Sequence, residues 1–170
     1  MIIIPYKFIF LETPRTGSKS CRAVLSKIPG ATVSEKCHVG CNLAMAIKRA
    51  TGLPLVTVTR DPLDHLVSWY LATANRKKPF VDFIEKGLPI GKLTERPGFD
   101  PFILNPYRDI ADKVFWLERG LFNMFNRLGI LVDEMPHINE HNKDLVEKDG
   151  KALFAASLYF VDDYAWQLTL

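Results

Sequence analysis

Residues 7–20, KFIFLETPRTGSKS, carry the clearest indication of the fold. The first six residues (7–12) predict a short buried strand, which residues 2–4 (III) are expected to extend. The turn-rich TPRTGSKS (13–20) follows at once and leads into CRAVLSKI (21–28), whose apolar positions have helical spacing. A strand that enters a helix through such a loop places free backbone N–H groups at the helix start, where they can bind an anion.

The rest of the chain continues the alternation of strands and helices. LVTVT (55–59) is rich in β-branched residues and lies between two prolines, so it predicts a central strand. Helices are predicted on either side of it, at residues 42–51 and 62–74. Further along, the patterns predict helices at residues 80–87, 121–129 and 150–168 and a strand at residues 113–118. This order predicts an α/β fold in which helices flank a central parallel sheet.

The composition is that of one soluble globular domain spanning residues 1–170, with 48% hydrophobic and 24% charged residues. The net charge of +3 is too small for the basic stripe of a nucleic-acid-binding protein, so no nucleic-acid partner is expected. No apolar stretch is long enough to cross a bilayer, and the start of the chain lacks the features of a signal peptide. Three cysteines are an odd number for a disulfide framework, which favours a reducing compartment and predicts a cytoplasmic protein.

A zinc site is a weaker interpretation of the cysteines. Cys37, His38 and Cys41 lie close together in the sequence, but no second ligand pair of the usual spacing accompanies them. Free thiols and no metal are therefore the expectation.

The loop at residues 13–20 carries the donors that a phosphate or sulfate group requires. Gly17 allows close approach of the backbone, Ser18 and Ser20 add hydroxyl donors, and Arg15 and Lys19 add positive charge. The loop does not match the P-loop of ATP- and GTP-binding proteins, because Ser18 separates Gly17 from Lys19 where that motif has the two adjacent. An ordinary strand-to-helix turn is the alternative interpretation.

A second set of anion-binding groups follows the strand at residues 55–59. Arg60 stands at the end of this strand, and Ser68 lies almost two turns into the next helix. A guanidinium fork and a hydroxyl in these places can share one phosphate. Alternatively, Arg60 forms a surface ion pair with Asp61 or Asp64, which contributes little to stability. Both loops follow strands of the predicted parallel sheet, and ligands of such folds bind at the carboxyl ends of the strands.

Together, the two segments resemble the paired nucleotide-binding motifs of the PAPS-dependent sulfotransferases, especially the branch that includes carbohydrate sulfotransferases. In that family a strand leads into a Pro-Lys-Thr/Ser-Gly-Thr-Thr-Ser-like loop, and a later strand leads into Arg-Asp-Pro, five residues and Ser-x-Tyr. The matching residues here are Pro14, Thr16, Gly17, Ser20, Arg60, Asp61, Pro62, Ser68 and Tyr70. Arg15 stands where the family has lysine, and Lys19 replaces the second of its paired threonines. The resemblance continues at residues 112–130 and 136–139 and in the closing helix, so it covers nearly the whole chain.

The resemblance implies a sulfotransferase fold of the class shared with P-loop-containing nucleoside triphosphate hydrolases. It also implies transfer of a sulfuryl group from 3′-phosphoadenosine 5′-phosphosulfate (PAPS) to a hydroxyl of a carbohydrate or other small acceptor, with PAP as the product. The residues implied in nucleotide binding are Arg15, Thr16, Gly17, Ser18, Lys19, Ser20, Arg60 and Ser68, of which Arg15 is also a candidate catalytic residue.

His38 is the candidate general base for this reaction. It lies between the two motifs, about where this branch of the family places a histidine, and imidazole suits proton removal near neutral pH. Glu35 is the second candidate, because other branches use glutamate. The alternative for His38 is a loop or core histidine beside two cysteines. Two other functions stay open: a catalytically weak module that binds PAPS or PAP, and a nucleotide or small-molecule kinase on the same scaffold.

Overall fold

The computed structural model describes residues 1–72, 79–85, 104–136 and 155, which belong to two compact units. The first unit is built from residues 1–60 and 106–139, and the second from residues 61–105 and 140–170. Each unit has its own buried core. The expectation of one domain over residues 1–170 stays a prediction.

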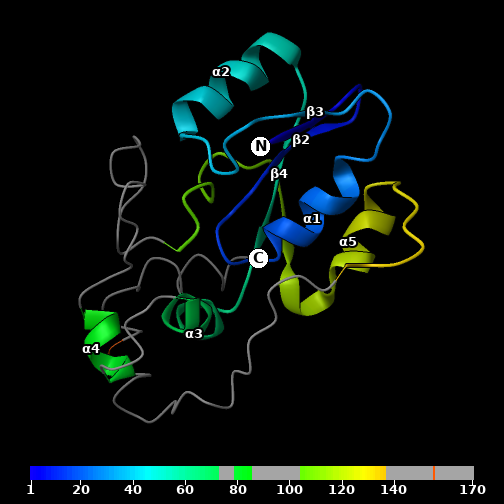
Figure 1. Cartoon of the computed structure of the whole chain (residues 1–170). Coiled ribbons are helices and arrows are strands. Elements are labelled where there is room, and N and C mark those ends of the chain that lie inside the picture. Colours follow the sequence, from blue (N-terminus) through cyan, green and yellow to red (C-terminus); the bar gives the residue numbers. More distant parts are fainter. Residues whose placement is uncertain (73–78, 86–103, 137–154, 156–170) are drawn as a thin grey trace. The chain divides into compact units, whose positions relative to one another are not determined.

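The first unit contains a five-stranded sheet with the order β3-β1-β2-β4-β5 (Figure 1). β2 and β5 both run parallel to β4, which lies between them, whereas β1 runs antiparallel to both β2 and β3. The strands are β1 (Ile2–Ile4), β2 (Phe8–Leu11), β3 (Thr32–Val33), β4 (Leu55–Thr59) and β5 (Lys113–Trp116). The α/β class is therefore confirmed. The prediction of a parallel sheet is correct for β2, β4 and β5 but wrong for β1 and β3, so the sheet is mixed.

β1 and β2 form a hairpin, which corrects the expectation that residues 2–4 extend one strand. The chain reverses at residues 5–7, where Tyr6 has a φ of 58° and the Lys7 N–H donates to the Ile4 carbonyl at 3.2 Å. Pro5 has no N–H for the sheet, so it favours a break at this point. A nearly continuous apolar run thus supplies two antiparallel strands.

Three helices belong to the described part of the first unit: α1 (Ser18–Leu25), α2 (Cys41–Thr51) and α5 (Leu121–Arg127). Figure 1 shows α1 and α5 beside each other, with α2 on the other side of the strands. α1 begins and ends three residues earlier than predicted, because its first turn closes on the left-handed Gly17. A short 3₁₀ turn, η2 (Leu117–Arg119), replaces the last two residues of the strand predicted at 113–118.

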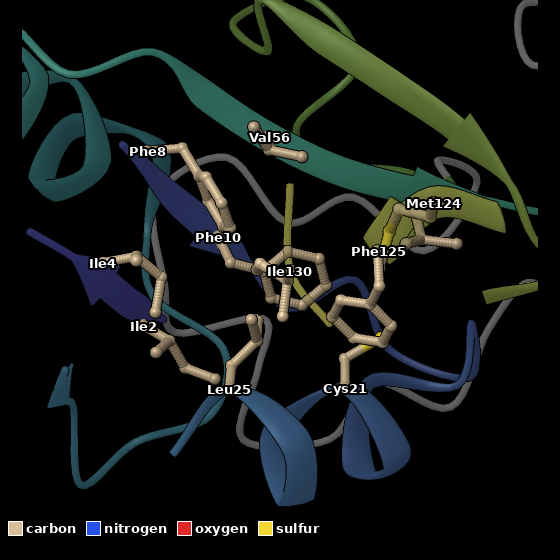
Figure 2. Close-up of a cluster of buried hydrophobic side chains, with 11 residues drawn as sticks. Ile2, Ile4, Phe8, Phe10, Cys21, Leu25, Val56, Met124, Phe125 and Ile130 are labelled. Carbon is tan, nitrogen blue, oxygen red and sulfur yellow. The ribbon is translucent and has the colours of Figure 1, made fainter. Parts of the chain in front are cut away.

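The main core lies between one face of the sheet and the helices α1 and α5 (Figure 2). Alternate residues of β2 and β4 point into it, as the two-residue period of a strand requires. Every residue of these two strands is buried, including Thr57 and Thr59 of β4, and the unbroken apolar run of β2 is typical of a strand that is covered on both faces. The buried residues of the main core are Ile2, Ile4, Phe8, Phe10, Cys21, Leu25, Val56, Val58, Met124, Phe125 and Ile130.

The described part of the second unit contains α3 (Pro62–Ala72) and α4 (Phe80–Glu85). Tyr70 links the two helices, because its ring lies 5.3 Å from that of Phe80 and 5.6 Å from that of Phe83, measured between centroids. Both helices match their predictions over the described residues. The predicted helix at 150–168, apart from the helical Ala155, and the family-like turn beyond Pro136 lie outside them. Among the described residues, no helix is long and apolar enough to span a membrane.

Candidate active site

The two segments predicted to bind anions begin at the same edge of the sheet. β2 and β4 are parallel neighbours in which Leu11 pairs with Thr57, so the residues that follow each strand emerge side by side. The Thr57 hydroxyl donates to the Leu11 carbonyl at 3.1 Å and lies 2.8 Å from the Thr13 hydroxyl. These buried contacts anchor the start of the loop at residues 13–17 to the neighbouring strand.

The loop itself is tightly folded against α1. The Thr16 hydroxyl donates to the Thr13 carbonyl at 2.9 Å, and the Cys21 N–H donates to the Gly17 carbonyl at 3.0 Å. Arg15 and Gly17 both have positive φ values, 63° and 75°. The loop therefore leads directly to the first turn of α1, whose N–H groups lack partners within the helix and can serve an anion.

Arg15 and Arg60 come together although 45 residues separate them. The Arg60 Nη1–H donates to the Arg15 carbonyl at 3.3 Å, and only 8% of Arg60 is exposed. Burial, together with the positive charge of Arg60, lowers the pKa of the Arg15 guanidinium. Two cations held this close repel each other, and a bound anion would offset that repulsion.

A carboxylate also faces Arg60. Arg60 Nε lies 3.8 Å from Glu118 Oε1, on the η2 turn that follows β5, and Glu118 is exposed. An ion pair this exposed contributes little stability. The Asp61 carboxylate accepts the Asp64 N–H at 3.0 Å, and the pairing of Arg60 with Asp61 or Asp64 stays an alternative prediction.

His38 lies against the start of the same loop. Its Nδ1 atom is 2.5 Å from the backbone carbonyl oxygen of Glu12, which can only accept a hydrogen bond. Nδ1 therefore carries a proton, and in the neutral form of the ring Nε2 has the lone pair that a general base needs. The imidazole is half-buried, whereas Glu35, the other candidate base, is exposed.

The remaining predicted residues differ in their surroundings. Thr16 and Ser20 are buried, Ser18 is half-buried and Lys19 is exposed on α1. Ser68 is half-buried on α3, which belongs to the second unit. Its part in nucleotide binding stays a prediction from the sequence.

Glu12 and Arg22 are site residues that sequence reasoning did not find. Glu12 is 1% exposed, and Arg22 holds both of its carboxylate oxygens, with Nε to Oε1 at 2.7 Å and Nη2 to Oε2 at 2.6 Å. Hydrogen bonding to Glu12 raises the pKa of Arg22. The signal available in the sequence was a glutamate directly after a buried strand, because an acidic residue there needs a partner.

The three cysteines are free, and burial raises the pKa of the Cys21 thiol. Cys41 donates its thiol proton to the Pro106 carbonyl at 3.0 Å. Within the described residues, no three His, Cys, Asp or Glu side chains are arranged to hold a metal ion.

The site thus combines the loop at residues 13–17, two adjacent arginines and a histidine whose Nδ1 contacts a backbone carbonyl. No protein-family model, curated protein or solved structure matches this chain.

Proposed function

We propose that this protein is a PAPS-dependent sulfotransferase with the sulfotransferase variant of the P-loop fold. It moves a sulfuryl group from PAPS to a hydroxyl of a carbohydrate or other small acceptor and releases PAP. The observation that carries the proposal is a pair of contacts at the exits of two parallel strands, in which Arg60 contacts Arg15 and His38 contacts the Glu12 carbonyl. A doubly phosphorylated nucleotide needs cations at two places, and a hydroxyl acceptor needs a base nearby.

In this proposal the loop and α1 hold the 5′-phosphosulfate. The backbone N–H groups at the start of α1 and the hydroxyls of Ser18 and Ser20 donate to its oxygens, and Arg15 and Lys19 balance its charge. Arg60 binds the 3′-phosphate, and the resemblance implies Ser68 as a further donor. Charge neutralisation by groups that are already in place is the main contribution such a site makes to group transfer.

The chemical step requires one proton transfer and one displacement. His38 Nε2 removes the acceptor hydroxyl proton while the acceptor oxygen forms a bond to sulfur. The bond between sulfur and the bridging oxygen breaks, and PAP leaves with that electron pair. Arg15 stabilises the developing charge on the bridging oxygen. A single positioned base contributes on the order of 10²–10⁴-fold to such a rate.

The test is transfer of labelled sulfate from PAPS to a panel of hydroxyl acceptors, combined with calorimetric titration of PAP. Arg60→Ala is expected to weaken PAP binding about 10- to 100-fold, the loss expected for hydrogen bonds to a charged group. His38→Ala is expected to bind PAP like the wild type and to lose on the order of 100-fold or more in turnover. Arg49→Ala, which removes an exposed cation from α2, is the control for net charge and is expected to change neither.

Three outcomes would redirect the proposal. PAP binding without transfer to any acceptor indicates a nucleotide-binding module. Stabilisation by ATP with Mg²⁺ but not by PAP indicates a kinase. Unchanged turnover in His38→Ala removes this residue from the mechanism and leaves Glu35 as the candidate base.

A further inference from the structure

We propose that Glu12 and Arg22 are positioning residues, which hold the His38 imidazole against the phosphate-type loop in its reactive tautomer. This inference rests on the proposed function, in which His38 is the base. Neither residue belongs to the motifs that suggested the activity. Their role follows from their contacts with each other and with the segment that carries His38.

The ion pair spans the loop. Glu12 directly follows β2, and Arg22 lies on α1, so the pair joins the two ends of the segment at residues 13–17. Its geometry is bidentate, with separations of 2.6 and 2.7 Å, and the carboxylate is almost fully buried. A flat guanidinium is required for this arrangement, since a lysine ammonium cannot make two parallel bonds in the same plane.

The same two residues also hold the segment that carries His38. Arg22 uses its third nitrogen, Nη1, to donate to the Ser34 carbonyl at 3.1 Å. Glu12 uses its backbone carbonyl to accept the His38 Nδ1–H. The Met1 ammonium adds to the network, because it contacts the Glu12 carboxylate and donates to the Cys37 carbonyl at 2.7 Å.

Displacement of Glu12 would therefore change more than stability. The Glu12 carbonyl oxygen accepts from Nδ1 and so favours the tautomer of His38 with a proton on Nδ1, and that oxygen belongs to the residue whose carboxylate is bound by Arg22. If the carbonyl moves, the imidazole can place its proton on either nitrogen, and the fraction with a lone pair on Nε2 falls. A shift of about 1 Å in a reacting group can lower a rate by on the order of 100-fold.

The test uses two conservative variants, Glu12→Gln and Arg22→Lys. Glutamine keeps the shape of Glu12 but not its charge, and Arg22→Lys keeps the charge but not the fork. Arg22 is also partly exposed, so this second variant is expected to fold even where Glu12→Gln does not. Asp112→Asn is the matched control, because it breaks another ion pair of the first unit, between Lys48 on α2 and Asp112.

The decisive measurement is a long-range ¹H–¹⁵N spectrum of the histidine side chains, which reports the tautomer of each ring, with His38→Gln for assignment. In both variants the Nδ1–H population of His38 is expected to fall, and kcat to drop about 10- to 100-fold while the Kd for PAP changes less than about threefold. Asp112→Asn is expected to keep the tautomer and kcat of the wild type.

A wild-type tautomer in both variants, or an unchanged kcat, would overturn the positioning role. That result would leave the proposed function intact if the wild type transfers sulfate and His38→Ala lowers turnover as expected. Conversely, absence of transfer in the wild type would contradict the proposed function, and the spectrum would still decide whether Glu12 and Arg22 control the tautomer.

Discussion

At the residue scale, Arg15 combines two features that cost stability in the ligand-free protein. Its φ of 63° is unfavourable for a residue with a side chain, by about 1–2 kcal/mol. Burial and the neighbouring charge of Arg60 lower the pKa of Arg15, so its charged form is less favourable in the folded protein than in water. Strain and repulsion of this kind gather at ligand sites, where they serve binding and not stability.

Replacement of Arg15 by methionine is expected to separate these two effects. Arg15→Met keeps the backbone strain and removes the charge, so the unfolding free energy of the ligand-free protein should stay the same or rise. The stabilisation by PAP should fall, because one cation of the site is lost. Urea titrations with and without PAP measure the unfolding free energy and its increase on ligand binding, and Arg49→Met is the control. A large loss of stability in ligand-free Arg15→Met would argue against repulsion between the two arginines.

At Gly17, both the backbone conformation and the neighbouring side chains disfavour a larger residue. Its φ is 75°, and an added Cβ would lie 3.0 Å from Leu121 Cδ1 and 3.3 Å from Leu117 Cδ1. Gly52 has a similar φ of 69° but nothing within 4 Å of that position. A comparison of the two glycines therefore separates the free-energy cost of the steric contact from that of the positive φ.

We expect Gly52→Ala to lower the unfolding free energy by about 1 kcal/mol through the backbone alone. Gly17→Ala should cost about 1 kcal/mol more, because the leucine side chains must move. Gly17→Ala should also weaken PAP binding, and Gly52→Ala should not. Equal losses for the two variants in chemical denaturation would show that the leucines relax freely.

At the scale of the elements, α5 depends on one face for its attachment to the sheet. Phe125 is fully buried in the main core (Figure 2). Phe122, on the same helix, is 49% exposed. Phe125→Ala is expected to cost about 3–5 kcal/mol, because it removes a large buried ring and leaves a cavity. Phe122→Ala should stay within about 0.5 kcal/mol of the wild type. Denaturant midpoints of the two variants test this, and similar midpoints would place α5 outside the cooperative core.

A second interaction between elements predicts a dependence on pH. Burial disfavours the charge of Asp112, but its hydrogen bonds from Lys48 Nζ and from the Leu55 N–H at 2.7 Å outweigh this effect and lower its pKa below 3.8. Because the pKa is lower in the folded state, the carboxylate stabilises the fold above about pH 3.8 and loses this effect as the pH falls through the folded value.

The corresponding experiment compares Asp112→Asn with the wild type from neutral to acidic pH. The variant should be less stable at neutral pH, because the ion pair with Lys48 on α2 is lost. The difference in melting temperature should shrink below about pH 3.8 and approach zero when the wild-type carboxylate is protonated. A difference that does not change with pH would mean that the charge of Asp112 has no role.

At the scale of the whole molecule, ligand binding should appear as stabilisation. PAP at about 100 times its Kd adds about 2.7 kcal/mol to the stability of the state that binds it, which for a chain of this size raises the melting temperature by about 5–10 °C. The two units need not unfold together, so hydrogen exchange in β2 and β4 is the more specific readout. Protection of these strands by PAP, weakened by added salt, is the expected result, and no protection at saturating PAP would contradict the proposed site.

Local chemistry made much of the fold predictable. β4 lies at the predicted residues 55–59, because β-branched residues between prolines favour a strand wherever the chain places them. The helix predicted at 42–51 differs from α2 by one residue. The loop at residues 13–20 and Arg60 could be selected in the same way, because glycine, serine and basic residues directly after a buried strand are typical of anion-binding loops.

Contacts between distant residues depend on the folded chain as a whole. The pairing of the strands determines the direction of β1, the formation of the two-residue strand β3 and the contact between Arg15 and Arg60. This pairing is set by the packing of the whole sheet. The hydrogen bond from His38 to Glu12, 26 residues away, and the bidentate pair of Glu12 with Arg22 have the same origin. The order of the amino acids alone thus predicts which residues are candidates for binding an anion or taking a proton. Only the folded structure brings these residues of the first unit together. A buried charged group is shielded from water, so its partner must be another group of the protein that packing places beside it.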